Sequence, residues 1–271
     1  MDRETLASFG QVCYNFRWTA AKYRPISRAV PIWNFFYLGF WKFTSGSFVM
    51  FFDPLYFILV GPFFLLGLLA QVWVKSAFVS GEQIDVPLSG AEAAREIMRQ
   101  NGLDLPIECI DGQLSDHYDP TEKVLRLSQA VYHGRNAAAV GVAAHEVGHA
   151  IQDAKGYSPL VVRNMAVPLA NLGSGAGIWL FIIGMIASLP MLVKAGIILF
   201  SCVVFFQVVN LPVEFNASTR AKYHLANMGM LTDDAQRAVS KTLTAAAMTY
   251  VAATLQSVMT LVYLFMRGGD E

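Results

Sequence analysis

Charged residues are scarce in this chain, and neither sign prevails. They make up 15% of 271 residues, with 20 Lys and Arg against 20 Asp and Glu. A soluble domain carries about 25% charged residues, and a nucleic-acid-binding surface needs a positive excess. The composition therefore argues against an ordinary soluble domain and indicates no nucleic-acid partner.

Cysteine is equally scarce. Cys13, Cys109 and Cys202 lie far apart in the sequence and form no CxxC pair. An odd number of widely spaced cysteines does not build a disulfide framework. We therefore expect three buried thiols.

Long apolar runs dominate the sequence instead. Hydrophobic residues form 55% of the chain, and about 20 apolar residues are enough to cross a bilayer. Four runs qualify, at 54–74, about 168–190, 195–213 and 243–266. A fifth, at 33–52, carries Lys42 near its centre, where a lysine is costly, so we interpret it as an interfacial aromatic segment. The sequence thus predicts a multi-pass protein of the cell membrane with about four transmembrane helices.

The polar stretch at 75–164 contains the signals of a small α+β region. The letters "SGAE" from Ser89 are a capping box that starts a helix. The stretches "PIECID", "QLSDHY" and "KVLRLS" then alternate like short strands. A last helix is expected from about Asn136 to Lys155, with Gly156 as its stop.

That last helix contains the letters "HEVGH". His145 and His149 stand four residues apart, so they lie about 40° apart on one helical face, a separation that suits two imidazoles on one tetrahedral zinc. Glu146 lies beside them and can take a proton from a zinc-bound water. Two surface histidines with a chance glutamate are the alternative, but HExxH occurs by chance in under about 1% of chains of this length.

A catalytic zinc needs a third protein ligand. The metzincin pattern would place Gly at 152 and His at 155, where this chain has Gln152 and Lys155. Asp153 lies too far along the helix to share the metal, so Glu214 in "LPVEFNASTRA" is the better candidate, at the start of a helix that leaves the membrane. Two predicted spans separate the histidines from Glu214, which returns the chain to the same side. An ordinary interfacial glutamate would show the same local pattern.

Together these residues resemble the YugP-type membrane zinc metallopeptidases. The resemblance covers about residues 50 to 265 and rests on "MFFDPLYFILVGP", "LSDHYDP" with "LRLS", "GVAAHEVGHAIQ" and "LPVEFNAS". It implies a gluzincin-like site in which Glu214 completes the zinc ligands. The chain also resembles, more distantly, the membrane heat-shock proteases and CaaX-type proteases. Those usually carry an acidic residue at the position of Ser218, so the partner of a zinc histidine must be something else here.

His117 in "LSDHYDP" is a further catalytic candidate, because it could stabilise the oxyanion of a tetrahedral intermediate. A histidine that merely hydrogen-bonds within a turn fits equally well. Asp116 and Asp119 could orient it or shape the turn. The strand they close could offer an edge on which an extended peptide pairs.

The sequence therefore predicts a mainly α integral membrane protein with a small α+β zincin-like catalytic domain. It would hydrolyse peptides or proteins, membrane proteins included, with one Zn²⁺ and Glu146 as general base. The alternative is a non-catalytic membrane protein that uses a metal for structure or transport, for which Glu146 would have no use. Lys and Arg beside the spans favour a cytoplasmic active site.

We divide the chain by these signals. The segments are a basic and aromatic extension (1–49) that is dispensable or not native, a first transmembrane helix (50–75), the catalytic region with the HExxH helix (76–164), a transmembrane hairpin (165–213), the zinc-ligand helix and loop (214–242), and a last transmembrane helix with its tail (243–271).

Overall fold

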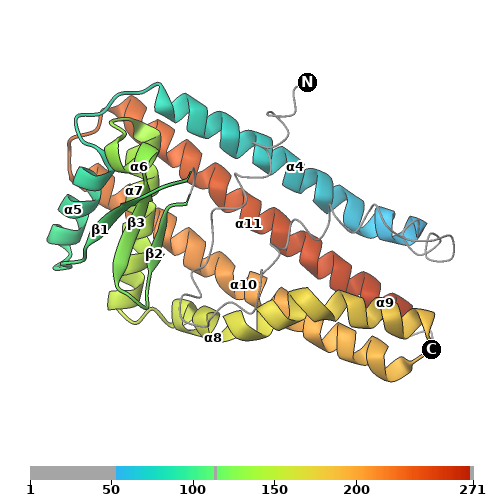
Figure 1. Cartoon of the computed structure of the whole chain (residues 1–271). Helices are drawn as coiled ribbons and strands as arrows, with labels where there is room; N and C mark the ends of the chain where they lie inside the picture. Colours follow the sequence, from blue (N-terminus) through green and yellow to red (C-terminus); the bar gives the residue numbers. More distant parts are fainter. Residues whose placement is uncertain (1–52, 113–114, 269–271) are drawn as a thin grey trace. The chain divides into compact units, whose positions relative to one another are not determined.

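A computed structural model describes residues 53–112 and 115–268 (Figure 1). The N-terminal extension and the interfacial segment expected at 33–52 lie outside these residues. The described residues fall into two compact units. The mixed unit contains Gln71–Tyr157 and Val213–Ala247, and the helical unit contains 53–70, 158–212 and 248–268.

Four helical segments among the described residues are long and apolar enough to cross a membrane. They are α4 (Pro54–Glu82), the segment Ser158–Ile186, α10 (Pro190–Asn227) and α11 (Asp233–Gly268). The second segment consists of α8 (Ser158–Leu172), the π-helical turn η1 (Gly173–Gly177) and α9 (Ile178–Ile186). The prediction of a mainly α membrane protein with four spans is confirmed.

The second span ends earlier than the apolar run suggested. Helix α9 ends at Ile186, and the chain turns at 187–189, where Ser188 adopts a φ of 51°. The next helix begins at Pro190, which suits a first turn because its missing N–H needs no partner there. Hydropathy could not reveal this turn, since its residues carry no charge.

Helix α10 continues beyond its apolar part. Its 38 residues extend about 57 Å at 1.5 Å per residue, whereas the hydrocarbon core is about 30 Å thick. The expected helix start beside Glu214 is wrong, because Pro212 lies inside α10. Neighbouring groups can compensate for a proline in a membrane helix, so the helix carries Glu214 without a break.

The mixed unit contains a small sheet beside two helices. Its strands β1 (Ile107–Ile110), β2 (His117–Asp119) and β3 (Val124–Ser128) have the order β1-β3-β2. Strand β1 is parallel to β3, and β2 is antiparallel to it. All three expected strands are present, and β2 forms one edge of the sheet.

Local capping signals set the helices of this unit. The expected capping box is present at the start of α5 (Gly90–Gln100), where Ser89 and Glu92 exchange hydrogen bonds with each other's backbone N–H. Helix α7 (Ala137–Ala154) begins at the side-chain cap of Asn136 and is followed by Gly156 with a φ of 59°. A short helix that the sequence analysis did not predict, α6 (Gln129–His133), follows β3.

A glycine brings α7 and α10 into direct contact. A Cβ atom placed on Gly148 would lie 2.7 Å from the carbonyl oxygen of Ala217, which is closer than two such atoms can approach. Because the position has no side chain, the two backbones pack against each other. The histidines of α7 and Glu214 of α10 are thereby held on helices in contact.

Glycines play the same part in the helical unit. A Cβ atom on Gly184 would lie 2.6 Å from the backbone nitrogen of Val193, and one on Gly196 would lie 2.5 Å from that of Phe181. Small residues let membrane helices approach backbone to backbone. The two helices of the α9–α10 hairpin therefore pack closely, backbone against backbone.

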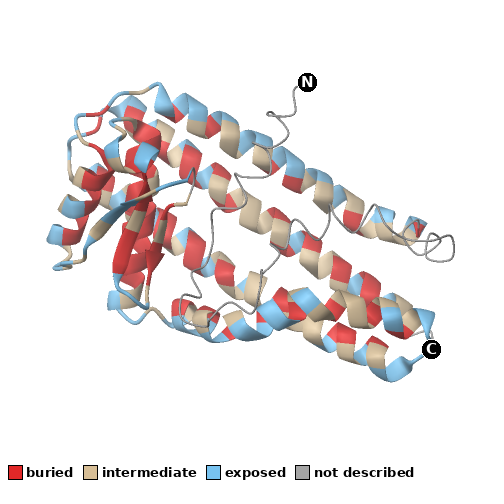
Figure 2. Ribbon diagram, viewed as in Figure 1, coloured by how far each residue is buried: buried red, intermediate tan, exposed pale blue. Residues whose placement is uncertain are grey.

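Large apolar side chains remain exposed along the helical unit (Figure 2). Ile58 on α4 is 69% exposed and Met165 on α8 is 73% exposed. Such surfaces are unfavourable in water but match the hydrocarbon of a bilayer. We interpret them as lipid-facing.

The expectation of buried thiols is wrong for the two cysteines that the structure describes. Cys109 is exposed on β1, and Cys202 is partly exposed on α10. Strand β1 is an edge strand with two exposed central residues, so a thiol there is not covered. Cys13 lies outside the described residues.

Candidate metal centre

Helix α7 presents His145 and His149 on one face, as their spacing predicts. Both side chains are buried, and their ring centroids lie 4.8 Å apart in an edge-to-face arrangement. The surrounding helix is built largely from Ala, Val and Gly, which leaves room for the rings. The pair therefore points into a closed space.

Glu214 on α10 reaches the same space. Its Oε2 atom lies 3.3 Å from Nε2 of His145 and 3.7 Å from Nε2 of His149. One ligand atom from each of the three residues lies within 4.8 Å of the others. Two ligands on a tetrahedral zinc, each about 2.0–2.1 Å from the metal, are about 3.3–3.4 Å apart. The spacing of these donors thus suits one small cation.

Glu146 lies beside this group and is also buried. Its Oε2 atom accepts a hydrogen bond of 3.1 Å from the backbone N–H of Tyr118, while its buried Oε1 atom has no hydrogen-bond partner among the described residues. Burial raises the pKa of Glu146 to about 8, and the carboxylates of Glu214 and Asp116 add to that rise. One oxygen is therefore fixed and the other is left for a further ligand.

The electrostatics of the centre favour a cation. Burial lowers the pKa of His145, but Glu214 and Glu146 outweigh it and raise that pKa above its usual value. A buried carboxylate such as that of Glu214 is stable only with compensating positive charge. The donor set of two imidazoles and one carboxylate is one that zinc takes in catalytic sites, so these residues fit the metal.

Gln152 orients one of the two histidines. Its side chain is 0% exposed, and its Oε1 lies 3.1 Å from Nδ1 of His149. Its Nε2 donates to the carbonyl of Val213 at 2.8 Å and to Oδ1 of Asn216 at 3.1 Å. Because Nε2 of Gln152 donates, its Oε1 is the acceptor, and His149 carries its proton on Nδ1. That tautomer leaves Nε2 of His149 unprotonated and able to bind a metal.

Sequence reasoning missed this role. Gln152 served only to exclude the metzincin pattern, although a glutamine one turn beyond the second histidine, in an otherwise apolar helix, was a usable signal. Gln152 joins α7 to α10 in one hydrogen-bond chain.

Ser218 is the corresponding neighbour of the other histidine. Its Oγ lies 3.2 Å from Nδ1 of His145, and both residues are buried. We expected a different partner for this histidine, because the residue at position 218 is not acidic. A hydroxyl can accept the Nδ1 proton as a carboxylate does, so Ser218 takes the place itself.

Strand β2 runs past the centre, and its side chains alternate in direction. Tyr118 is buried in the core that includes α7 and donates from its hydroxyl to Asp153 at 2.7 Å. Asp153 thus holds the strand and, as expected, is not in the His-His-Glu group. His117 pairs across the sheet with Arg126, which puts its ring on the opposite face from Tyr118.

The residues around His117 have defined partners. Nδ1 of His117 lies 2.7 Å from the carbonyl of Ser115, and its buried Nε2 has no partner among the described residues. Asp116 accepts hydrogen bonds from the backbone and hydroxyl of Ser128. Asp119 accepts from Arg126 at 2.8 Å. The two aspartates therefore shape the turn and the sheet, and the structure does not bring His117 into contact with the His-His-Glu group.

Comparison with known proteins agrees with these features. Residues 56–268 match a family model described as "putative neutral zinc metallopeptidase". The chain is 47% identical over 208 residues to a Bacillus subtilis (strain 168) protein named "putative membrane protease YugP". The aligned residues cover 74% of this chain and 92% of that relative. No solved structure gives a significant match.

Proposed function

The chain belongs to the neutral zinc metallopeptidase family, and on that premise we propose that it is an integral membrane endopeptidase with one zinc ion. The observation that carries the proposal is the buried group of His145, His149 and Glu214 with Glu146 beside it. A metal that served structure alone would not need a second carboxylate that is not a ligand and has one oxygen unpaired. That carboxylate favours catalysis over the alternative of a metal used for structure or transport.

The directions of the donor atoms support the proposed ligand roles. Gln152 and Ser218 engage Nδ1 of their histidines, so both Nε2 atoms face Oε2 of Glu214. A zinc ion held there would polarise the scissile carbonyl and make a bound water more acidic.

Glu146 would act as general base and then as general acid. Its Oε2 is held by the N–H of Tyr118, so its orientation is set before substrate binds. Its Oε1 would take a proton from the attacking water and pass it to the leaving amine. The raised pKa of about 8 suits a group that must both accept and return a proton near neutral pH.

The free edge of β2 is the proposed binding surface for the substrate. The strand is at the edge of the sheet, and the N–H of Tyr118 points from that edge to Glu146. A peptide in extended conformation could therefore pair with β2 beside the base. We retain His117 as a candidate that assists from this strand, with its buried Nε2 as the reason.

We further propose that the centre faces the cytoplasm. Counted along the sequence, the charges beside the spans are uneven. Six are assigned to the side of the centre, Lys75, Lys155, Arg220, Lys222, Arg237 and Lys241, and three to the other, Lys42, Lys194 and Arg267. Positive residues collect on the cytoplasmic side of short loops. Arg163, which the sequence suggested as a further flanking charge, is buried within α8 and does not count.

Amide substitutions at the two glutamates test the proposal. Glu146→Gln keeps the His-His-Glu group, so zinc content should stay at the wild-type level while peptide hydrolysis falls about 100-fold or more, the contribution of a general base. Glu214→Gln removes an anionic ligand, so zinc content itself should fall, and added zinc should restore part of the activity.

The matched control is Glu108→Gln, an exposed carboxylate of the same unit that pairs with Arg126. It should leave both zinc content and turnover unchanged. An active Glu146→Gln enzyme would refute the role of Glu146 as base. Full zinc occupancy in Glu214→Gln would refute Glu214 as a ligand, and His117 and His224 would be examined next.

A further inference from the structure

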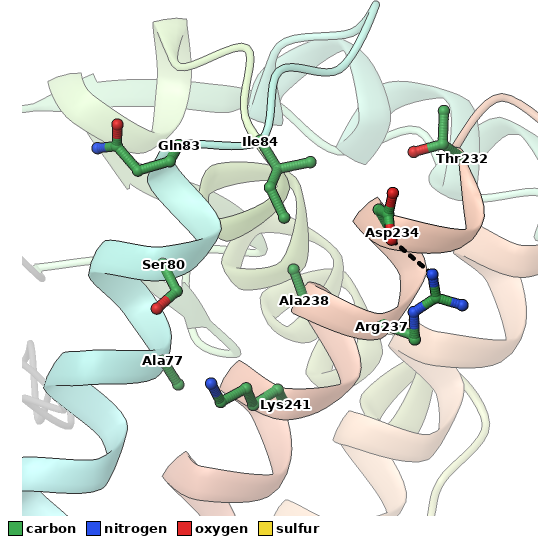
Figure 3. Close-up of a pocket in the computed structure, with 9 residues that line it drawn as sticks. All are labelled: Ala77, Ser80, Gln83, Ile84, Thr232, Asp234, Arg237, Ala238 and Lys241. Carbon is green, nitrogen blue, oxygen red and sulfur yellow. Dashed lines mark hydrogen bonds and ion pairs between the residues drawn. The ribbon is translucent and has the colours of Figure 1, made fainter.

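A pocket separate from the metal centre lies between the end of α4 and the beginning of α11 (Figure 3). It has a volume of about 480 Å³ and is lined by residues within 77–84 and 232–241. All of these belong to the mixed unit. Its lining includes two cations, Arg237 and Lys241, and one anion, Asp234.

The pocket lies where both helices leave their apolar segments. On α4, residues 54–74 carry no charge, and Lys75 is the first charged residue after them. On α11, Lys241 is the last charged residue before the uncharged residues 242–266. The headgroup layer is about 5–7 Å thick on each side of the hydrocarbon, or about one helical turn. Ala77 and Lys241, which both line the pocket, therefore lie at the depth of the lipid phosphates.

One hydrogen bond closes the pocket at its membrane end. The hydroxyl of Thr242 donates to the carbonyl of Ala77 at 3.2 Å and ties α11 to α4. On the membrane side of that contact, Val72 and Trp73 of α4 are exposed. Both side chains are largely apolar, so an acyl chain that descends from the pocket would meet an apolar surface. Tryptophan also favours the membrane interface.

The charge balance of the pocket leaves one cation. Arg237 pairs with Asp234 at 2.5 Å, whereas Lys241 forms no hydrogen bond or ion pair with any residue that the structure describes. Figure 3 shows its ammonium group extending from α11 towards Ala77 and Ser80 on α4. The three charges sum to +1, which matches the single negative charge of a phosphodiester.

Two further donors line the same pocket. Thr232 accepts the backbone N–H of Ala235 with its hydroxyl oxygen, which leaves its own hydrogen to donate. Arg237 has five N–H groups and gives one to Asp234 in the ion pair. Lysine, arginine and hydroxyl groups together are the groups that bind phosphate in proteins.

We propose that this pocket binds the phosphate of an anionic lipid headgroup, with Lys241 as its main contact. Basic pockets between transmembrane helices on the cytoplasmic side suit such headgroups. Both walls also support the zinc-motif helix, since Gly81 of α4 packs on Ala138 and Gly141 packs on Val239 of α11. A lipid bound between α4 and α11 would therefore stabilise the mixed unit.

The test compares the full chain in nanodiscs of phosphatidylcholine alone and with phosphatidylglycerol added. Native mass spectrometry should show preferential retention of phosphatidylglycerol by the wild type, and the anionic lipid should raise its Tm. Lys241→Gln should lower the retention ratio about fivefold, the effect of one cation near a membrane surface. Lys241→Arg should keep most of it. Lys194→Gln is the matched control, because it removes one lysine of α10 that does not line the pocket.

Two results would overturn the proposal. An equal retention ratio for Lys241→Gln and the wild type would show that the lysine does not bind the lipid. If inorganic phosphate in phosphatidylcholine nanodiscs raised the Tm as much as phosphatidylglycerol does, the ligand would be free phosphate and not a lipid. An unchanged Tm of Lys241→Gln in phosphatidylcholine alone verifies that the variant is folded.

Discussion

Replacing Gln152 with methionine tests whether an uncharged residue outside the ligand set controls metal affinity. Methionine has a similar length but neither accepts the Nδ1 proton of His149 nor donates to Val213 and Asn216. The substitution therefore removes all three hydrogen bonds that the buried amide forms. It leaves His145, His149 and Glu214 themselves in place.

The expected loss is large for a residue that does not touch the metal. Loss of an outer partner of a metal-binding histidine costs about 10–100-fold in affinity, or about 1.4–2.7 kcal/mol. The buried N–H of His149 is also left without an acceptor, which costs about 1–3 kcal/mol of folding stability. Zinc affinity and Tm should therefore both fall.

The assay is a zinc titration against a competing chelator, together with Tm measurements and the visible spectrum of the cobalt-substituted protein. A changed cobalt spectrum would report an altered ligand geometry, which a general loss of stability does not produce. Gln256→Met is the control, because Gln256 is a buried glutamine in the helical unit. It should lower Tm without changing zinc affinity.

The reasoning would be refuted if Gln152→Met bound zinc as tightly as the wild type and kept its cobalt spectrum. A fall in Tm alone would then mean that Gln152 serves the packing of α7 on α10 and does not orient His149. Equal losses of zinc affinity in Gln152→Met and Gln256→Met would refute it as well, because the loss would then reflect stability.

Four other outcomes can be checked. His117→Ala should lower kcat/KM with zinc retained, and an unchanged rate would leave His117 a structural residue. Burial raises the pKa of Asp119, but hydrogen bonds from backbone N–H groups and the Arg126 guanidinium outweigh it and hold that pKa below its usual value. The charged form of Asp119 therefore stabilises the fold above about pH 4. Asp119→Asn should lower stability at pH 7 by about 1–3 kcal/mol, a difference that shrinks as the pH falls through the lowered pKa in acid-unfolding curves. Gly148→Val should lower Tm and zinc content, because its side chain would meet the carbonyl of Ala217; normal values would show that the helices can separate freely. A chain that begins at Met50 should insert in membranes and cleave peptides, and its failure to fold would show that residues 1–49 pack on the rest.

The sequence by itself determined the features that depend on neighbouring residues. The spans followed from runs of uncharged residues, and the ends of α5 and α7 followed from Ser89, Asn136 and Gly156. The spacing of His145 and His149 was enough to place two donors on one face, because an α-helix repeats every 3.6 residues. Glu214 was chosen as the third candidate from the residues around it and from a count of membrane crossings, which needs no distances.

Only the tertiary structure decided how these parts meet. The partners of the histidine Nδ1 atoms are joined to other elements: Gln152 reaches Val213 on α10, and Ser218 reaches back to α7. The fixed oxygen of Glu146 depends on a backbone N–H in β2, 28 positions earlier. Backbone groups are the same at every residue, so no sequence pattern marks the one that will be used. Side-chain orientation at this centre is therefore set largely by packing between α7, α10 and β2.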